Sequence, residues 1–265
     1  MNIFLNGKQI ITFSQSIDAL RCEYGFPEGS ITILNGFGVQ DSALSENDRV
    51  HILEKGTTPD KDTLEELLYA RHTPMIQDKF KKACVGIAGL GGLGSNIAVN
   101  LARTGIGRLV IADHDTVDPT NLNRQQYRIR HLGMYKTDAL KAELGEINPY
   151  VEIINVNRKV TEENAAEIFG GCDIVCEAFD NAECKAMLVN TLLEKLPEVK
   201  VVAASGLAGL GSCNDIRTRK IGSRLIICGD GVSEAGCGTG LMAPRAAVCA
   251  GHQSNAVLQL ILGEI

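Results

Sequence analysis

The stretch Ala83-Cys-Val-Gly-Ile-Ala-Gly-Leu-Gly-Gly-Leu-Gly94 decides the fold. Its first six residues are typical of a buried strand, and a helix is expected over residues 92–104. The glycines between them follow the pattern Gly-x-Gly-x-x-Gly at Gly89, Gly91 and Gly94. Glycines let the backbone approach a phosphate, and the N–H groups and dipole at a helix start favour negative charge. The stretch therefore predicts a phosphate site, with tight strand–helix packing as the competing interpretation of the glycines.

Strands and helices alternate from this stretch onward. The expected strands are residues 83–88, 108–113, 151–156, 173–176 and 199–204, and the expected helices are 92–104, 137–147, 162–169 and 182–196. This alternation predicts an α/β fold with a Rossmann-like, mostly parallel sheet covered on both faces. The tail differs, because a hairpin is expected at 213–219 and 224–228, followed by a long closing helix at 242–262.

The N-terminal segment has a different order of elements. Asn6-Gly7 separates two short apolar runs and predicts a β-hairpin. A helix over 16–24 with Ser16 as N-cap and strands over 30–34 and 49–53 complete a small α+β unit. The polar residues 55–62 are typical of a linker, and a helical connector follows that Pro74 interrupts. We therefore divide the chain into domains at 1–56 and 83–265, joined by a linker and connector at 57–82.

Composition excludes several classes of partner and location. The net charge is −6 and the pI is near 5.5, with no basic block, so neither nucleic acid nor an anionic membrane is expected as a partner. The longest apolar runs fall short of the roughly 20 residues that span a bilayer. Met1 leads directly into a strand-like segment rather than an export signal. We therefore expect a cytoplasmic protein.

The nine cysteines are expected to be free thiols. Their number is odd, the chain is long, and no pair has Cys-x-x-Cys spacing. The closest pair is Cys172 and Cys176, and we expect both within one buried strand. No structural zinc is predicted.

The residues after the second strand distinguish ATP from a nicotinamide. Asp113 ends that strand, where a carboxylate can accept hydrogen bonds from ribose hydroxyls of either cofactor. Asn-Leu-Asn-Arg-Gln125 and Gly-Met-Tyr-Lys136 then supply cations. Hydride transfer does not need them. Attack of a carboxylate on an α-phosphate does, because negative charge builds up in the transition state.

The order of these motifs resembles the ThiF/MoeB/E1 adenylyltransferase family. The glycine loop, Asp-x-Asp, Asn-Leu-x-Arg-Gln, Gly-x-x-Lys and a later Asp-Asn appear in family order across roughly residues 82–181. The resemblance implies ATP as the nucleotide, bound with Mg²⁺. The residues that it implies for nucleotide binding are Gly89, Gly91, Gly92, Gly94, Asp113, Asp115, Asn121, Arg124, Gln125 and Lys136.

Within that set the resemblance implies separate roles. Asp113 would bind ribose, Gln125 would support its loop, and Asn121, Arg124 and Lys136 would bind the phosphates. Asp180 would hold Mg²⁺ and take part in catalysis with Arg124 and Lys136. The competing interpretations are plain surface charges for Arg124 and Lys136, and a cap on the helix near Ala182 for Asp180.

Two further catalytic candidates match the family less closely. Arg71 precedes the first strand of the larger domain, where the family carries an arginine that reaches ATP, often from the other subunit of a dimer. It is equally well explained as a solvated helix residue. Cys237 lies one residue from the position of a mobile-loop thiol in some members. Cys228 and Cys249 are expected to pack in a strand and a helix.

The N-terminal segment resembles ThiS, a β-grasp sulfur carrier with a ubiquitin-like fold. Ile-Leu-Asn-Gly36 and Leu-Ser-Glu-Asn-Asp-Arg-Val50 carry the resemblance. A working carrier ends in a free Gly-Gly carboxylate, whereas Lys55-Gly56-Thr57 continues into the linker. The segment is either a degenerate carrier that docks or regulates, or a stabilising appendage.

Together these features predict an enzyme that adenylates the C-terminal carboxylate of a separate ThiS-like sulfur carrier for thiamine biosynthesis. The resemblance also implies a homodimer and a sulfur donor such as a cysteine desulfurase. Three alternatives stay open: a MoaD-type or other ubiquitin-like carrier, an NAD-dependent Rossmann oxidoreductase, and a non-catalytic carrier-binding protein.

Overall fold

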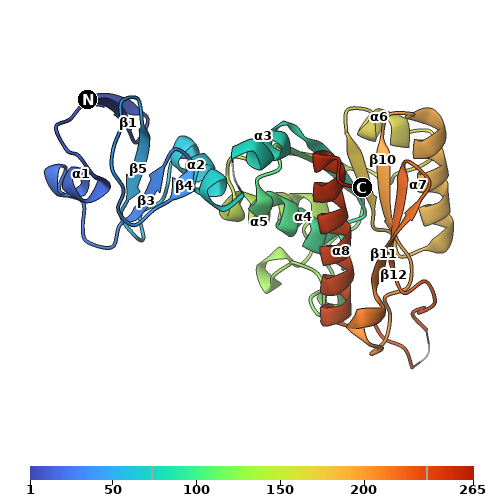
Figure 1. Ribbon diagram of the computed structural model, residues 1–265. Helices are drawn as coiled ribbons and strands as arrows, with labels where there is room; N and C mark the ends of the chain where they lie inside the picture. The colour runs from blue at the N-terminus through green and yellow to red at the C-terminus, as the bar shows by residue number, and fades with distance from the viewer. Residues whose placement is uncertain (73, 237) are drawn as a thin grey trace. The chain divides into compact units, whose positions relative to one another are not determined.

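The computed structural model describes residues 1–72, 74–236 and 238–265. Its internal contacts divide the chain into two compact units, Met1–Asp78 and Lys79–Ile265. Figure 1 labels their helices and strands. Among the described residues, no helix combines the length and apolar character that crossing a lipid bilayer requires.

The first unit is built on a five-stranded sheet with the order β2-β1-β5-β3-β4. Asn6 and Gly7 both have positive φ, 48° and 77°, as a tight hairpin turn requires, and they join β1 to β2. The elements are β1 (Asn2–Leu5), β2 (Lys8–Ile11), α1 (Ile17–Glu23), β3 (Ile31–Leu34), β4 (Phe37–Gly38), β5 (Arg49–Leu53) and α2 (Lys61–His72). The predicted hairpin and both predicted strands are therefore present.

Helix α1 covers one face of this sheet. Ile17 and Leu20 of the helix pack with Val50 and Ile52 of β5 in one buried cluster. Ser16 caps the helix as predicted, because its side chain accepts a hydrogen bond from the N–H of Ala19.

Helix α2 covers the opposite face. Ile33 and His51 are direct cross-strand partners, so their side chains point to the same side of the sheet. They are only 1% and 3% exposed. Helix α2 contacts β3 and β4, and Oε1 of its Glu66 lies 3.8 Å from Nε2 of His51. The ThiS-like sheet is thus enclosed on both faces.

The second unit contains a seven-stranded sheet with the order β11-β12-β10-β9-β6-β7-β8. Every neighbouring pair is parallel except β11 with β12. The strands are β6 (Cys84–Ala88), β7 (Arg108–Asp113), β8 (Glu152–Asn157), β9 (Ile174–Glu177), β10 (Lys200–Ala204), β11 (Arg217–Ile221) and β12 (Leu225–Gly229). The expected Rossmann-like fold class is confirmed.

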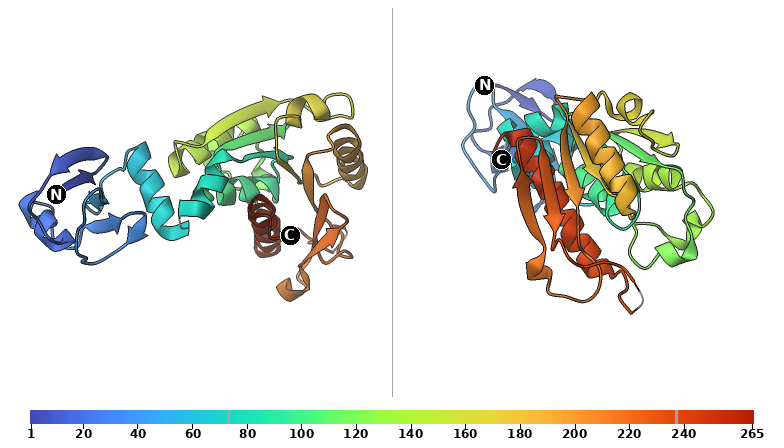
Figure 2. Two further views of the ribbon diagram at one scale, coloured as in Figure 1. Left: turned by 45° about the horizontal axis from the view of Figure 1, so that its top comes forward. Right: turned by 90° about the vertical axis from the view of Figure 1, so that its right-hand side faces the viewer.

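Helices cover both faces of this sheet, as Figure 2 shows. Helix α4 contacts both α5 and α8 on one side, and α6 and α7 pack together on the other. The helices are α3 (Pro74–Lys82), α4 (Gly94–Thr104), α5 (Lys136–Ile147), α6 (Ala165–Phe169), α7 (Ala182–Lys195) and α8 (Ala243–Leu262). Helix α4 begins at Gly94 rather than at the predicted residue 92, because the loop continues to Leu93, just before the third glycine of the pattern.

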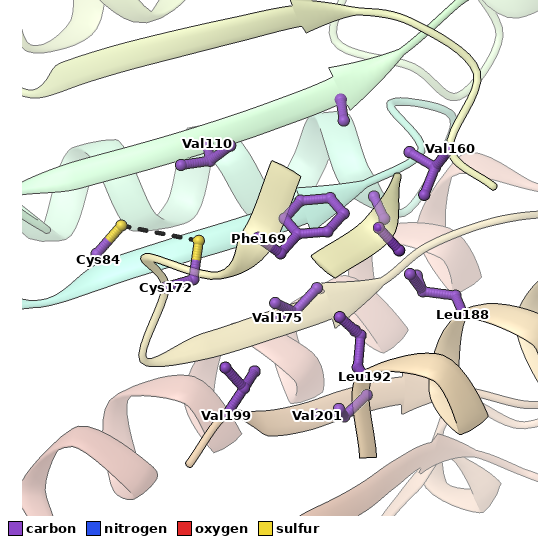
Figure 3. Close-up of a cluster of buried hydrophobic side chains, with 13 residues drawn as sticks. Cys84, Val110, Val160, Phe169, Cys172, Val175, Leu188, Leu192, Val199 and Val201 are labelled. Carbon is purple, nitrogen blue, oxygen red and sulfur yellow. Dashed lines mark hydrogen bonds between the residues drawn. The ribbon is translucent and has the colours of Figure 1, made fainter. Parts of the chain in front are cut away.

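The core on the α6–α7 side is packed around Phe169 (Figure 3). A Cβ added at Gly86 of β6 would lie 2.6 Å from Cδ1 of Phe169. Gly86 is therefore a packing glycine that lets this aromatic ring rest on the central strand.

Two local predictions are wrong. Cys172 lies in the turn before β9, so only Cys176 belongs to the buried strand, although both side chains are buried. The expected strand at 213–219 begins only at Arg217, because Ser212 caps a short 3₁₀ turn, Cys213–Asp215.

Candidate functional site

The site lies where the direction of chain crossover reverses. Strand β6 has β7 on one side and β9 on the other, so connections leave it in opposite directions. At such a switch point the carboxyl ends of the strands leave a crevice that binds ligands in open α/β sheets. Here Gly89 follows β6, and Ala178 follows β9.

The glycine loop contains two kinds of glycine. A Cβ at Gly94 would lie 1.8 Å from the carbonyl oxygen of Gly89, and Gly89 itself has a φ of +87°. Packing thus requires a glycine at position 94, and backbone conformation requires one at position 89. Gly91 differs, because a Cβ there would meet only Nε2 of Gln125, at an ordinary 3.8 Å. The packing interpretation explains Gly89 and Gly94, while the backbone at Gly91 leaves room for a ligand.

Asp113 connects the glycine loop to the following segment. Its Oδ2 accepts a hydrogen bond from the N–H of Leu90 at 2.7 Å, and its Oδ1 accepts one from the N–H of Asp115 at 2.8 Å. Tyr127 holds the same loop from the other side, since its hydroxyl donates to the carbonyl oxygen of Leu90 at 2.8 Å. Asp113 therefore shapes the loop through both oxygens, and each oxygen retains capacity for one more donor.

Lys136 is a buried cation paired with Asp115, whose N–H is bound by the same Asp113 that holds the glycine loop. The residue is 6% exposed, and its Nζ donates to Oδ2 of Asp115 at 2.8 Å. Burial raises the pKa of Asp115, but the hydrogen bond and charge of Lys136 outweigh it and hold that pKa below its usual value. The interpretation of Lys136 as a plain surface charge is therefore wrong.

Arg124 lies against the other side of the glycine loop. A Cβ at Gly92 would lie 3.3 Å from Cγ of Arg124. The guanidinium donates from Nη1 to Oδ1 of Asn123 at 2.8 Å and is half-buried. Nη1 also donates to the carbonyl oxygen of Thr120 at 3.3 Å, so the guanidinium is tied to its own turn while the side-chain stem lies against Gly92. Nε and Nη2 are further donors that an anion can use.

The turn that carries Arg124 is internally braced. Oδ1 of Asn121 accepts from the N–H of Asp118 at 3.0 Å, and the Asn121 carbonyl accepts from the N–H groups of Arg124 and Gln125. Asn121 thus has a structural role whether or not it also binds phosphate. Within the described part of the chain, Oε1 of the buried Gln125 has no hydrogen-bond partner.

An open cavity of about 340 Å³ lies beside this turn. It is formed by the Arg124 turn, by α4 and by the first turns of α8, and Asn123 ties two of these parts together through a 3.2 Å bond to the carbonyl of Leu241. The lining residues are Asn96, Leu122, Asn123, Arg124, Gln125, Gln126, Ala243, Pro244 and Ala247.

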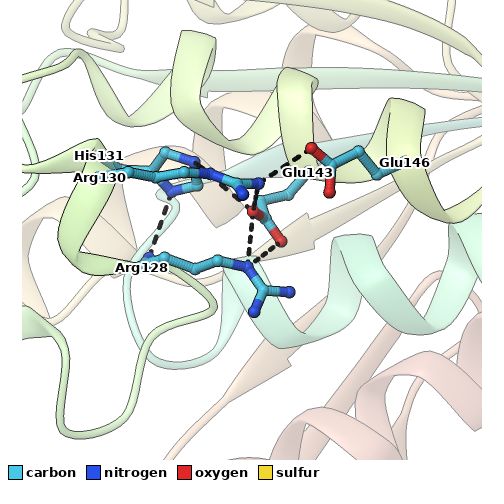
Figure 4. Close-up of polar contacts among 5 residues, drawn as sticks. All are labelled: Arg128, Arg130, His131, Glu143 and Glu146. Carbon is cyan, nitrogen blue, oxygen red and sulfur yellow. Dashed lines mark hydrogen bonds and ion pairs between the residues drawn. The ribbon is translucent and has the colours of Figure 1, made fainter.

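The segment between Arg124 and Lys136 is held by a buried carboxylate (Figure 4). Glu143 of α5 accepts from Nε of Arg128 at 2.8 Å and from Nη2 of Arg130 at 2.6 Å. Burial raises the pKa of Glu143, but the two arginines outweigh it and the pKa is lowered. Nδ1 of His131 accepts from the N–H of Arg128, which closes the turn. This cluster fixes the path of the chain into Lys136.

Asp180 lies on the β9 side of the crevice. A Cβ at Gly89 would lie 2.9 Å from both the carbonyl oxygen of Ala178 and Cδ1 of Phe179, so the turn carrying Asp180 rests on the glycine loop. Asn181, and not Asp180, caps α7 by accepting from the N–H groups of Glu183 and Cys184. The capping interpretation of Asp180 is wrong, and its exposed carboxylate has no partner in the part of the chain described.

Sequence reasoning missed the buried carboxylate below this turn. Glu177 ends β9 with a fully buried side chain, and Nζ of Lys185 on α7 lies 2.9 Å from its Oε2. Burial raises the pKa of Glu177, against the opposing effect of Lys185. A charged residue at the end of the otherwise apolar Ile174–Glu177 run was the available signal.

A second buried ion pair braces the segment before α8. Nη2 of Arg245 lies 2.6 Å from Oδ2 of Asp230, and Nη1 of Arg245 donates to the carbonyl of Ser212 at 2.9 Å. Burial raises the pKa of Asp230, but hydrogen bonds from Ser233 and Val232 and the charge of Arg245 lower it to about 2.

The remaining candidates stand apart from this cluster. Arg71 is an exposed residue in the last turn of α2, within the first unit. Cys237 lies outside the described residues. Burial raises the pKa of Cys228 to about 11 and that of Cys249 to about 12, so these thiols are packing residues, as predicted.

In a second group of possible metal ligands, most carboxylate oxygens already accept hydrogen bonds. Donor atoms of Asp113, His114 and Asp115 lie within 4.8 Å of one another. Both oxygens of Asp113 already accept backbone N–H groups, and Asp115 is paired with Lys136. Asp180 therefore remains the better-placed carboxylate for a divalent cation.

The geometry defines an α/β protein with an anion-binding loop flanked by two cations and a free carboxylate. Residues 65–265 match the model of the ThiF family, and residues 1–56 match that of ThiS-like ubiquitin. The chain belongs to the ThiF family and carries an N-terminal ThiS-like domain.

Curated relatives match the central part of the chain. It is 39% identical over 133 residues to a molybdopterin-synthase adenylyltransferase of Haemophilus influenzae, covering 50% of this chain and 53% of that protein. It is 35% identical over 133 residues to a tRNA threonylcarbamoyladenosine dehydratase of Bacillus subtilis, covering 49% and 52%. The chain thus spans about half the length of these curated relatives.

A solved structure confirms the fold of the larger unit. The E. coli tRNA N6-threonylcarbamoyladenosine dehydratase, solved in complex with AMP, superposes with a TM-score of 0.69 at 21% identity. The match covers 79% of this chain and 99% of that one.

Proposed function

We propose that the protein is an ATP-dependent adenylyltransferase that activates the C-terminal carboxylate of a ThiS-like sulfur carrier for thiamine biosynthesis. The observation that carries the proposal is the placement of Lys136 and Arg124 around one glycine loop, with Lys136 buried beside Asp115. Family membership and the adenylyltransferase named among its relatives support the same activity.

The residues fit a nucleoside triphosphate and a divalent cation. The space at Gly91 admits a phosphate, the donor Nε2 of Gln125 borders that space, and α4 begins three residues later at Gly94, where a helix start favours negative charge. Asp180 supplies an exposed carboxylate on the turn that rests on Gly89 through Ala178 and Phe179. Bound Mg²⁺ would offset negative charge on the phosphates and orient them.

In the proposed reaction a carboxylate oxygen of the carrier attacks the α-phosphorus of ATP. The bond from that phosphorus to the bridging oxygen breaks, so that an acyl-adenylate and pyrophosphate form. Arg124 and Lys136 offset the charge that builds up on the phosphate oxygens in the transition state. Asp113 orients the loop, and with it the ribose end of the nucleotide.

The site supports a nicotinamide-dependent oxidoreductase less well than an adenylyltransferase. Hydride transfer has no use for a buried lysine and an arginine placed against the phosphate loop. A non-catalytic carrier-binding protein likewise gives no reason to maintain the Lys136–Asp115 pair. The catalytic proposal explains both cations.

The choice of a ThiS-type carrier rests on the ThiS-like domain of this chain. That domain does not present a free end, because Leu53 leads through a short linker into α2. The carrier is therefore a separate protein in this proposal. A cysteine desulfurase as sulfur donor, a cytoplasmic location and a homodimer, in which Arg71 would reach the partner's site, complete it.

The test is carrier-dependent exchange of labelled pyrophosphate into ATP. ThiS-type and MoaD-type carriers are compared with wild-type protein, Arg124→Ala and Asp180→Ala, and Arg158→Ala serves as an exposed control. We expect exchange that requires the ThiS-type carrier and falls about 100-fold or more in both site variants. Exchange with the MoaD-type carrier alone would reassign the substrate, and ATP binding without exchange would overturn the activity.

A further inference from the structure

A buried ion pair lies directly below the turn that carries Asp180. Glu177 ends β9 with no exposed surface, and its two oxygens lie 3.1 and 2.9 Å from Nζ of Lys185. Its Oε1 also accepts from the N–H of Phe179 at 2.7 Å. One carboxylate thus joins the last residue of the strand, the following turn and the second turn of α7.

The backbone of Glu177 is fixed as firmly as its side chain. It is paired with Ala88 across β6 and β9, one residue before Gly89. Its carbonyl oxygen accepts from Nε2 of Gln253 at 3.0 Å, and the same amide donates to Val202 of β10 at 3.2 Å. The turn therefore begins from a strand end that three neighbouring elements hold in place.

A buried ion pair of this kind is costly to form. Glu177 is fully buried, whereas the side chain of Lys185 is 24% exposed, so the carboxylate carries most of the desolvation cost. That cost is several kcal/mol for a buried ion, and apolar replacements of buried pairs are often equally stable. Stability alone therefore gives no reason for Glu177 and Lys185, because apolar residues surround them on β9 and α7. A need to hold the turn that carries Asp180 in a fixed position does explain the pair.

We propose that Glu177 and Lys185 are positioning residues that fix the Asp180 carboxylate relative to the glycine loop. The inference rests on the proposed function, because it gives Asp180 its task at the phosphates. Glu177 holds the turn at Phe179, one residue before Asp180, and Phe179 in turn rests against Gly89. Lys185 neutralises Glu177, so that no uncompensated negative charge lies beneath the bound phosphates.

The test compares Lys185→Met, Glu177→Gln and Lys185→Arg in the full-length protein. A displacement of about 1 Å at a reacting group costs on the order of 100-fold in rate. We therefore expect kcat for pyrophosphate exchange to fall about 100-fold in the first two variants, with KM for ATP changed by less than about threefold. Lys185→Arg keeps the charge and should restore most of kcat.

A second readout does not depend on turnover. Affinity for ATP is measured by titration calorimetry with Mg²⁺ and with EDTA. Wild type should bind more tightly with Mg²⁺, and Lys185→Met should lose most of that gain while binding ATP in EDTA as wild type does. An unchanged gain from Mg²⁺ would overturn the positioning role.

Arg224→Met is the matched structural control. Arg224 donates to the carbonyls of Leu193 and Leu196, at the other end of α7. This variant should lower the melting temperature but leave kcat and the Mg²⁺ effect unchanged. Equal kinetic losses in Arg224→Met would show that Lys185 acts only through stability. Absence of exchange in wild type would reject the proposed function instead, and the Mg²⁺ effect on ATP affinity would still decide the positioning role.

Discussion

Nζ of Lys136 lies 2.8 Å from Oδ2 of Asp115, and the lysine side chain is buried whereas the aspartate is half exposed. The ammonium group of Lys136 is therefore already removed from water before any ligand binds. In the proposed mechanism a phosphate takes the place of Asp115 on Lys136, and the open aspartate end of the pair leaves room for that exchange. The pair holds a cation ready for an anionic group.

Replacement of this lysine gives the first prediction. Lys136→Met keeps the length of the side chain and removes its charge, so pyrophosphate exchange should fall by about 100- to 1000-fold. Lys141→Met on the same helix is the control, because Lys141 is exposed and bonds only to Asn155 among the described residues. Similar rates for the two variants in the exchange assay would remove Lys136 from the proposed mechanism.

The two kinds of glycine give the second prediction. Gly94→Ala should lower stability markedly, because its Cβ would collide with the Gly89 carbonyl at 1.8 Å. Gly91→Ala meets only an ordinary contact and should melt like wild type, yet it should weaken ATP binding about tenfold or more, because the methyl group occupies phosphate space. Thermal melting and ATP titration of both variants check this. Wild-type ATP affinity in Gly91→Ala would place the phosphates elsewhere.

The Asp230–Arg245 pair gives the third prediction, on stability. Asp230 has a pKa of about 2 in the folded protein, below its ordinary value near 3.8. Its contribution is therefore fully present above about pH 4 and is lost as the pH falls through 2. Arg245→Met should cost about 3 kcal/mol at pH 7 and move the onset of acid unfolding to higher pH. Urea unfolding across pH 2 to 7 measures both effects, with the exposed Arg217→Met as control.

The fourth prediction concerns His51 in the ThiS-like domain. Burial lowers the pKa of His51, as does Arg49, while Glu66, Asp60 and Asp62 oppose the shift. The unfolded chain then binds a proton more readily than the folded one, so stability is present above about pH 6.5 and declines as the pH falls. Hydrogen exchange in β5 and α2, corrected for intrinsic rates, should accelerate below that pH. His51→Phe should remove the dependence, and an unchanged pH profile would contradict it.

Most of the larger unit could be predicted because its elements follow simple periodic patterns. Continuous apolar runs such as residues 83–88 mark buried parallel strands. All five predicted strands are present, although the edge strand β8 (Glu152–Asn157) contains no such run and is only partly buried. The two-residue strand β4 was missed, since Phe37–Gly38 is too short to show any period and forms only by pairing with β3.

The candidate site was predicted only where side chains follow a linear motif. Arg124 lies against Gly92 of the glycine loop and Lys136 pairs with Asp115, and their assignment to the phosphates stays a prediction. Glu177 could not be assigned, because its partner Lys185 lies on the next helix and its strand β9 is enclosed between β6 and β10. The competing interpretation of Asp180 as a helix cap is wrong, because the adjacent Asn181 caps the start of α7.

Helix α2 lies beyond residue 56, where the similarity to ThiS-like ubiquitin ends, yet it covers Ile33 and His51 of that domain. We therefore expect the segment that unfolds as one unit to extend beyond residue 56 and to include α2. A chain cut at residue 56 would return the side chain of Ile33 to water, at a cost of about 1.5–3 kcal/mol. In this protein the ThiS-like match ends at residue 56, whereas the compact unit extends to Asp78, so the connector contributes cover to the domain that precedes it.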